Sequence, residues 1–193
     1  PPGVVPDPED AAGPADAPQV DPGEARWRQL SDAVLNWTNT GAAVLDGKLY
    51  VIGGSSGVSQ RNQVYDIATD EWELTGSFMP KRDSAAVAAI GDRIYVVGGS
   101  GPAGSGAMDT VLIYDPATDT WSEGARAPLA VAAPGHAVLG GELYVVGGRT
   151  DNDETQLATS TVMVYDPERD SWRTVADYPE PAFYQACGAV EGL

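Results

Sequence analysis

Three stretches of the chain repeat the same motifs in the same order, and this repetition limits the fold more than any other feature of the sequence. A hexapeptide that ends in two glycines (LYVIGG, IYVVGG, LYVVGG) occurs at 49–54, 94–99 and 143–148. The glycine pairs lie 45 and then 49 residues apart. Each hexapeptide follows a run of small apolar residues and precedes a Tyr-Asp motif that leads to a tryptophan: Trp72, Trp121 and Trp172. A constant order at this period indicates an architecture in which each repeat is one supersecondary unit.

Each repeated motif is typical of a β-strand, because it is short, rich in β-branched or aromatic residues and closed by Gly, Pro or Asp. The hexapeptide strand is apolar on both faces, so it has to be covered on both. Asp115 and Pro116 follow the Tyr-Asp strand with the turn chemistry of a hairpin. The repeats therefore predict four antiparallel strands each, stacked as blades around an axis, with the tryptophans wedged between blades.

The motifs resemble the kelch repeat, whose marks are a double glycine after Tyr-Val, a Tyr-Asp, and a tryptophan six residues after the Asp. All three marks recur in each repeat, and the resemblance covers 27–193. The family's basic residue before the first strand has its counterpart in Arg82, whereas Trp37 and Val131 stand at the equivalent positions. The resemblance implies an all-β, kelch-type β-propeller, a fold shared with galactose-oxidase-like proteins.

We expect three complete four-stranded blades and an incomplete ring, because kelch propellers close with about five to seven blades. The complete blades are expected at about 41–76, 84–125 and 134–176, with partial strands of further blades at 25–31 and 184–193. The remaining blades would come from a longer chain of which this is a truncated piece, or alternatively from a second chain.

Residues 1–24 are expected to form a disordered acidic linker. They hold seven of the fifteen prolines and six acidic residues, with no Lys or Arg. A segment with so little to bury does not offset the entropy of its own ordering. The propeller domain is therefore expected at 25–193.

The charge of the chain argues against two classes of partner. Asp and Glu number 28 against 11 Lys and Arg, for a formal net charge of -17. Such a chain repels nucleic acid and anionic lipid, and no apolar run is long enough to insert in a membrane. Scarce lysine beside abundant Ala, Gly, Val and Asp leads us to expect a prokaryotic source. The sequence leaves the compartment open, and we lean to a secreted or cell-surface location.

The loops that join the second to the third strand lie on the same face as the segments that join one blade to the next. These loops are at 55–62, 100–110 and 149–161. Loops on a rigid scaffold are the usual place for binding residues, and arginine makes bidentate contacts with carboxylates. The candidate binding residues on this loop face are Arg61, Arg82, His136 and Arg149, each of which could equally have a structural role.

No catalytic residue, metal ligand or cofactor is predicted. A copper site of the galactose-oxidase kind would need two histidines, whereas the chain has one, even though Tyr184 and Cys187 are close in sequence. Cys187 is expected to be a small buried apolar residue. The acidic loop 151–154 could hold calcium but lacks a complete loop pattern, so a solvated acidic tip is favoured.

These features predict a non-catalytic scaffold that binds a protein or peptide through its loop face. The alternative is a piece of a kelch-type carbohydrate-active enzyme or glycan-binding module, similar to oxidases or sialic-acid epimerases, whose remaining blades would complete the site. Fold alone does not choose between them.

Overall fold

The computed structural model describes residues 27–36, 38–54, 61–77, 79–101, 106–150 and 157–189. The chain divides into two compact units, Pro1–Leu30 and Ser31–Leu193, and every strand lies in the second unit. The expected linker at 1–24 and the acidic loop at 151–154 lie outside the described residues.

The second unit contains three antiparallel sheets of four strands each, as the repeats predict. Blade 1 consists of β1 (Gly41–Leu45), β2 (Lys48–Ile52), β3 (Gln63–Asp66) and β4 (Glu71–Leu74). Blade 2 consists of β5 (Ala86–Ile90), β6 (Arg93–Val97), β7 (Val111–Asp115) and β8 (Thr120–Gly124). Blade 3 consists of β9 (Gly135–Leu139), β10 (Glu142–Val146), β11 (Val162–Asp166) and β12 (Ser171–Thr174). The described residues include no helix, and hence none that could span a membrane.

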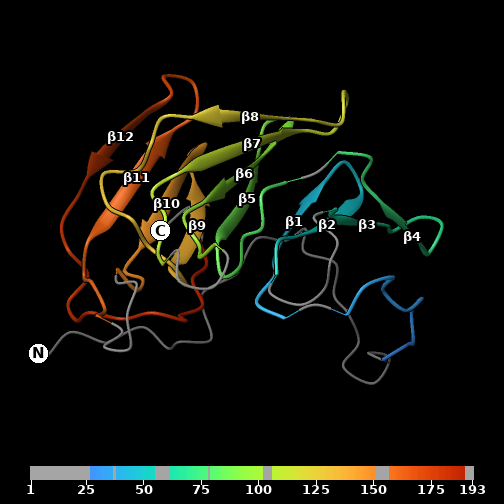
Figure 1. The fold of residues 1–193 in the computed structure, drawn as a ribbon, viewed down its shortest axis with the longest axis horizontal. Coiled ribbons are helices and arrows are strands. Elements are labelled where there is room, and N and C mark those ends of the chain that lie inside the picture. Colours follow the sequence, from blue (N-terminus) through green and yellow to red (C-terminus); the bar gives the residue numbers. More distant parts are fainter. Residues whose placement is uncertain are drawn as a thin grey trace, which may run out of the picture. The chain divides into compact units, whose positions relative to one another are not determined.

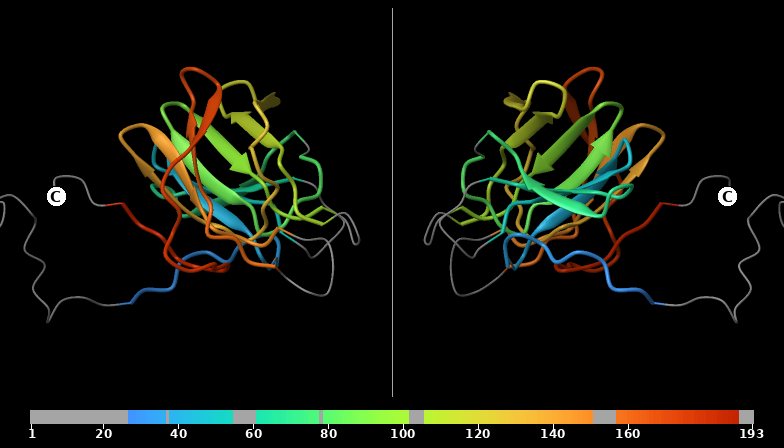
Figure 2. Two further views of the ribbon diagram at one scale, coloured as in Figure 1. Left: turned by 90° about the vertical axis from the view of Figure 1, so that its left-hand side faces the viewer. Right: turned by 90° about the vertical axis from the view of Figure 1, so that its right-hand side faces the viewer.

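The inner strands of the blades lie next to one another, with β5 between β1 and β9, while β4, β8 and β12 are the outer strands (Figure 1). Side views show the sheets stacked on one another, with the tight turns gathered toward one end (Figure 2). The three blades form an arc and do not close into a ring.

Strand β6 shows how the blades share their cores. Ile94 and Val96 point into a core between blades 1 and 2, whereas Tyr95 and Val97 point into a core between blades 2 and 3. All four side chains are at most 7% exposed. The alternation confirms that this hexapeptide strand is covered on both faces, which is why its side chains are aliphatic or aromatic.

The partial strands expected at 25–31 and 184–193 belong to further blades and stay a prediction. The described residues of these stretches, 27–31 and 184–189, are assigned no strand and join none of the three sheets.

In blade 2, and again in blade 3, a tyrosine and an aspartate tie the turn after the third strand to the blade before it. Tyr114 Oη donates to Asp119 Oδ1 at 2.8 Å, and Asp119, at φ 50°, also accepts from Ser77 N at 3.0 Å and Ser77 Oγ at 2.7 Å. Ser77 follows the outer strand of blade 1, so the carboxylate joins two blades. Asp170 repeats this by accepting from Tyr165 Oη and from Ala125 N.

The tryptophans reinforce the same boundaries. Trp172 stacks on Tyr165 with ring centroids 5.0 Å apart, and its indole nitrogen donates to Ala125 O of blade 2 at 2.8 Å. At Trp172 the predicted wedge is therefore a contact made by both the ring and its polar edge, whereas the buried indole nitrogen of Trp121 has no partner among the described residues.

The glycine pairs allow the connecting segments to lie against the strand ends. Gly99 N donates to Val131 O at 2.8 Å, and Gly54 and Gly148 make the same bond to the carbonyls of Arg82 and Ala182. A Cβ on Gly98 would lie 2.3 Å from Val131 O, and its φ is 66°. Only glycine allows both the left-handed backbone and the close approach.

Replacing Gly98 by alanine should therefore cost more than replacing Gly91, which has φ 59° but no neighbour within 4 Å of an added Cβ. Gly91→Ala should cost roughly 1–2 kcal/mol through backbone strain. Gly98→Ala should cost about 2 kcal/mol more, because the carbonyl of Val131 has to move. Urea unfolding of both variants measures the difference, and equal losses would contradict the close-approach argument.

The Asp119 bridge should make blade docking depend on pH. Burial acts to raise the pKa of Asp119, but hydrogen bonds from Ser77 and Tyr114 outweigh it and hold the pKa below 3.8. The stabilisation is thus complete above about pH 4 and is lost as the pH falls through the lowered pKa. Asp119→Asn, which tolerates the left-handed backbone, should lose about 2 kcal/mol at pH 6. Its deficit against the native chain should shrink below pH 4 in urea titrations, whereas a constant deficit would contradict the bridge.

Candidate functional site

The segments that lead into the inner strands form a continuous hydrogen-bonded series. Ser84 N donates to Asn39 O at 2.9 Å, Ala133 N to Ser84 O at 2.7 Å, and Tyr184 N to Ala133 O at 2.8 Å. All four residues have positive φ, between 51° and 57°. Each segment thus turns in the same way and places its side chains at an equivalent position on the loop face.

A pocket of about 310 Å³ lies where these segments meet, and we call it the axial pocket. Its lining residues come from the four segments: Asn39, Thr40, Ser84, Ala85, Ala133, Pro134, Tyr184, Gln185 and Ala186. Gln185 Nε2 donates to Val146 O at 2.8 Å, which fixes the fourth segment against blade 3. The pocket is therefore walled by backbone and small side chains, with the Tyr184 ring 64% exposed beside it.

The structure gives Arg82 a structural contact instead of an exposed position. The residue is 4% exposed. Its Nη1 donates to the carbonyls of Gly98 and Thr110, both at 3.0 Å, and Nη2 donates to Thr110 Oγ1 at 2.6 Å. Burial lowers the pKa of Arg82 to about 10, opposed by Glu123 and Asp109, so the side chain stays charged at neutral pH. Arg82 therefore holds together the strand ends of blade 2.

Arg149 occupies the position after the glycine pair of blade 3, equivalent to Ser100 in blade 2. Its Nη2 donates to Ser100 Oγ at 2.9 Å, across the boundary between the two blades. Its buried Nε has no hydrogen-bond partner in the described part of the chain. The backbone of Arg149 bridges Ala132, and that of Ser100 bridges Asp83, so both residues border the segments of the axial pocket.

Asp83 completes a polar group beside the axial pocket. Burial raises the pKa of Asp83, while the positive charges of Arg149 and Lys81 act to lower it. We call Asp83, Ser100 and Arg149 the axial cluster. The cluster combines a cation, a hydroxyl and a half-buried carboxylate, which are groups that can orient a polar ligand.

His136 lies on β9 and is turned to the neighbouring inner strand. Its Nε2 lies 3.0 Å from Val87 O, and the side chain is half-buried. Burial lowers the pKa of His136 despite hydrogen bonds with the backbone of Val87 and Pro134. The imidazole is therefore neutral at pH 7 and joins blades 2 and 3.

Arg61 lies directly before β3 in blade 1, partly exposed. Most of the loop that precedes it, at 55–60, lies outside the described residues, as do 102–105 and 151–156 of the other two loops. The structure thus places Arg149 at the boundary between blades 2 and 3, Arg82 against the strand ends of blade 2, and Arg61 in blade 1. Asp83 and Ser100 were not predicted as site residues. Only their positions in the repeat could have indicated them, since Asp83 follows Arg82 and Ser100 takes the position in blade 2 that Arg149 takes in blade 3.

Cys187 is exposed, contrary to the expectation of a buried apolar residue. It lies on the fourth segment, where a Cβ on Gly135 would come within 2.4 Å of its Sγ. One side of the thiol thus contacts blade 3. The described residues contain no group of three or more His, Cys, Asp or Glu side chains placed to hold a metal ion.

Radially stacked four-stranded sheets, joined on one face by short segments, define the chain as a β-propeller module. A family model described as the KLHDC2/KLHL20/DRC7 Kelch-repeats domain matches residues 21–191. The chain belongs to the kelch-repeat family.

Relatives resemble parts of the chain. Kelch-like protein 25 of Xenopus tropicalis is 34% identical over 80 residues, which are 41% of this chain and 14% of that protein. Kelch-like protein terF of Aspergillus terreus is 41% identical over 76 residues, 35% of this chain and 16% of that protein. The matches thus span less than a fifth of these relatives. Both are eukaryotic, and the prokaryotic source expected from composition stays a prediction.

The solved structure of YjhT matches the fold with a TM-score of 0.69 and 22% sequence identity. The match covers 78% of this chain and 54% of that chain. At this identity the likeness establishes the shared propeller fold.

Because Arg82 and Arg149 make different contacts, replacing each of them should lower the free energy of unfolding by a different amount. Arg82→Met should cost about 2–4 kcal/mol, since it removes three hydrogen bonds made by a buried cation and leaves the carbonyl of Gly98 without this donor, while Thr110 O keeps the bond from Gly98 N. Arg149→Met should cost about 1 kcal/mol, because it removes one bond to a hydroxyl. Chemical denaturation of the two variants tests this, and a larger loss for Arg149→Met would reverse the assignment.

Proposed function

We propose that this kelch domain is a non-catalytic scaffold that binds a protein or peptide through its loop face, with the axial cluster and axial pocket at the centre of the contact. The observation that carries the proposal is the position of Arg149. Its guanidinium donates to Ser100 Oγ across the boundary between blades 2 and 3, and its backbone bridges Ala132, the neighbour of Ala133 in the pocket lining.

The chemistry of the site favours a ligand with a carboxylate. Arginine binds carboxylates through paired hydrogen bonds, and the bond from Nη2 to Ser100 Oγ limits the positions that the guanidinium can take. A ligand carboxylate near Arg149 would compete with Asp83, whose pKa is raised by burial. A protonated Asp83 could instead donate a hydrogen bond, so binding should strengthen as the pH falls through the raised pKa of Asp83.

The axial pocket suits a small side chain or a chain terminus of the ligand. Its volume of about 310 Å³ is at the lower end of ligand pockets, and Tyr184 offers an exposed ring for packing beside it. Arg61 would contact the ligand farther from the centre, on blade 1. In this proposal Arg82 and His136 act indirectly, by holding the strand ends that carry the site.

A peptide array tests the proposal with the 193-residue chain. Each peptide is presented with two C-termini, the free carboxylate and the amide. It is also presented in two compositions, one with Asp and Glu and one with Asn and Gln in their place. We expect the carboxylate forms to bind, and Arg149→Ala and Arg61→Ala each to weaken binding by about fivefold to tenfold. Arg169→Ala is the control, because Arg169 is exposed in the turn after β11, at the opposite end of the blades.

Binding that is equal for the carboxylate and amide forms, or that survives the double substitution of Arg61 and Arg149, would contradict the proposal. Selective binding of oligosaccharides on a parallel glycan array would instead favour the glycan-binding alternative.

A further inference from the structure

A second cavity lies at the opposite end of the blades from the loop face. It opens between blades 1 and 2, beside the tight turns, and has a volume of about 480 Å³. We call it the interblade cleft. Its charged lining residues are Asp46, Lys48, Glu73, Asp92, Arg93 and Asp119.

The cleft is lined by residues of both blades. Val64 and the paired rings of Tyr50 and Tyr114, whose centroids are 6.1 Å apart, form the apolar part of the lining. Val64 stands at the position that Ile113 takes in blade 2.

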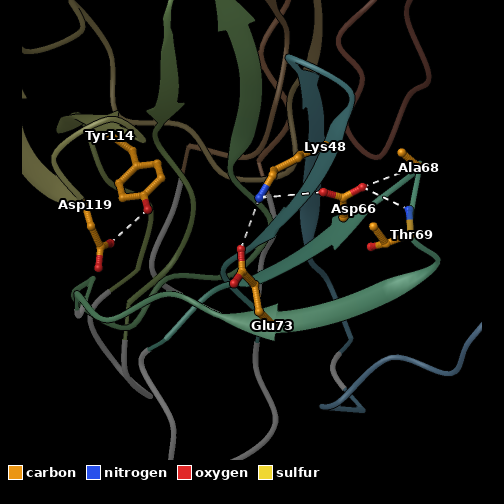
Figure 3. A network of polar contacts seen from close by, with 7 residues as sticks. All are labelled: Lys48, Asp66, Ala68, Thr69, Glu73, Tyr114 and Asp119. Carbon is orange, nitrogen blue, oxygen red and sulfur yellow. Dashed lines mark hydrogen bonds and ion pairs between the residues drawn. The ribbon is translucent and has the colours of Figure 1, made fainter.

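The charges around the cleft are mostly negative. Lys48 Nζ lies 3.3 Å from Glu73 Oε1 and 3.9 Å from Asp66 Oδ2, and Arg93 pairs with Asp92 and Asp115 at 2.7 and 3.2 Å (Figure 3 shows the Lys48 pairs). Asp46 forms no ion pair with any residue that the structure describes. Because carboxylates outnumber the two cations, the field at the mouth attracts a positive charge.

Tyr50 presents an unused polar group to this space. The residue is 6% exposed, and its hydroxyl forms no hydrogen bond within the described segments, whereas Tyr114 Oη donates to Asp119. Burial raises the pKa of Tyr50, opposed by Lys48 and assisted by Asp46 and Glu73, so the phenol is neutral. A neutral phenol oxygen accepts a hydrogen bond from an ammonium group, and the tyrosine ring adds cation–π attraction.

We propose that the interblade cleft binds a lysine side chain of a partner polypeptide, with Asp46 and Glu73 pairing its ammonium group and Tyr50 accepting a hydrogen bond from it. The incoming lysine displaces Lys48 from Glu73, which is exposed enough for exchange at a side-chain exposure of 66%. This site is separate from the proposed loop-face site, since it lies at the other end of the blades. It binds a cation, whereas the loop-face site binds a carboxylate.

The test uses two peptides in a Gly-Ser background, one with a central lysine and one with norleucine, titrated into the ¹⁵N-labelled 193-residue chain. We expect saturable changes in the NMR chemical shifts of cleft residues with the lysine peptide and none with the norleucine peptide. Asp46→Asn and Glu73→Gln should each weaken binding by about fivefold, and Tyr50→Phe by about threefold. Glu71→Gln is the matched control, because it removes the same charge from the same strand outside the cleft.

Lys48→Met separates binding from folding. Removing the internal cation leaves Glu73 unpaired, so the affinity for the lysine peptide should rise about threefold, an effect that a damaged fold would not produce. Equal binding of the norleucine peptide, no binding of the lysine peptide, or equal losses in Glu71→Gln and Glu73→Gln would overturn the proposal. Saturation of the cleft by spermidine but not by the peptide would overturn the polypeptide as its occupant.

Discussion

The whole arrangement depends on connecting segments that lie against glycine backbone at the ends of the hexapeptide strands. At Gly98 the neighbouring carbonyl is so close that a single methyl group has no room. Backbone hydrogen bonds at Gly54, Gly99 and Gly148 repeat the contact in each blade. Because these bonds use only backbone atoms, they form independently of the side chains that the segments carry.

That independence explains how one scaffold carries different chemistry at equivalent positions. The carbonyl that meets the glycine pair belongs to Arg82 in one segment, to Val131 in the next and to Ala182 in the third. Their side chains differ in size and charge, yet the backbone contact is the same. After the glycine pair, Ser100 and Arg149 likewise share a position and come into contact across a blade boundary. A site can therefore change residue by residue while the blades stay in place.

The sequence predicts the blades well because the features that make them are local and repeated. Glycine pairs, Tyr-Asp turns and tryptophans each mark an end of a strand, and the structure has strands where these marks predict them. The structural role of Arg82 was not predictable in the same way, because the carbonyls that accept its hydrogen bonds lie 16 and 28 residues away in the sequence. The interblade cleft was not predictable from the sequence either, because its lining residues belong to blades 1 and 2 and come together only where the two blades dock. The loop face was predictable as a surface, but the link between Arg149 and Ser100 depends on how two blades dock.

The hydrogen bonds from Tyr184 to Ala133, from Ala133 to Ser84 and from Ser84 to Asn39 all point the same way around the arc. The series of hydrogen bonds therefore has a direction. Ser84 and Ala133 each donate to the connecting segment before them and accept from the connecting segment after them. Two arcs of this kind can extend each other only head to tail, because a head-to-head meeting would set donor against donor. Directionality of this sort makes rotation about a single axis the natural symmetry of any assembly that prolongs the series.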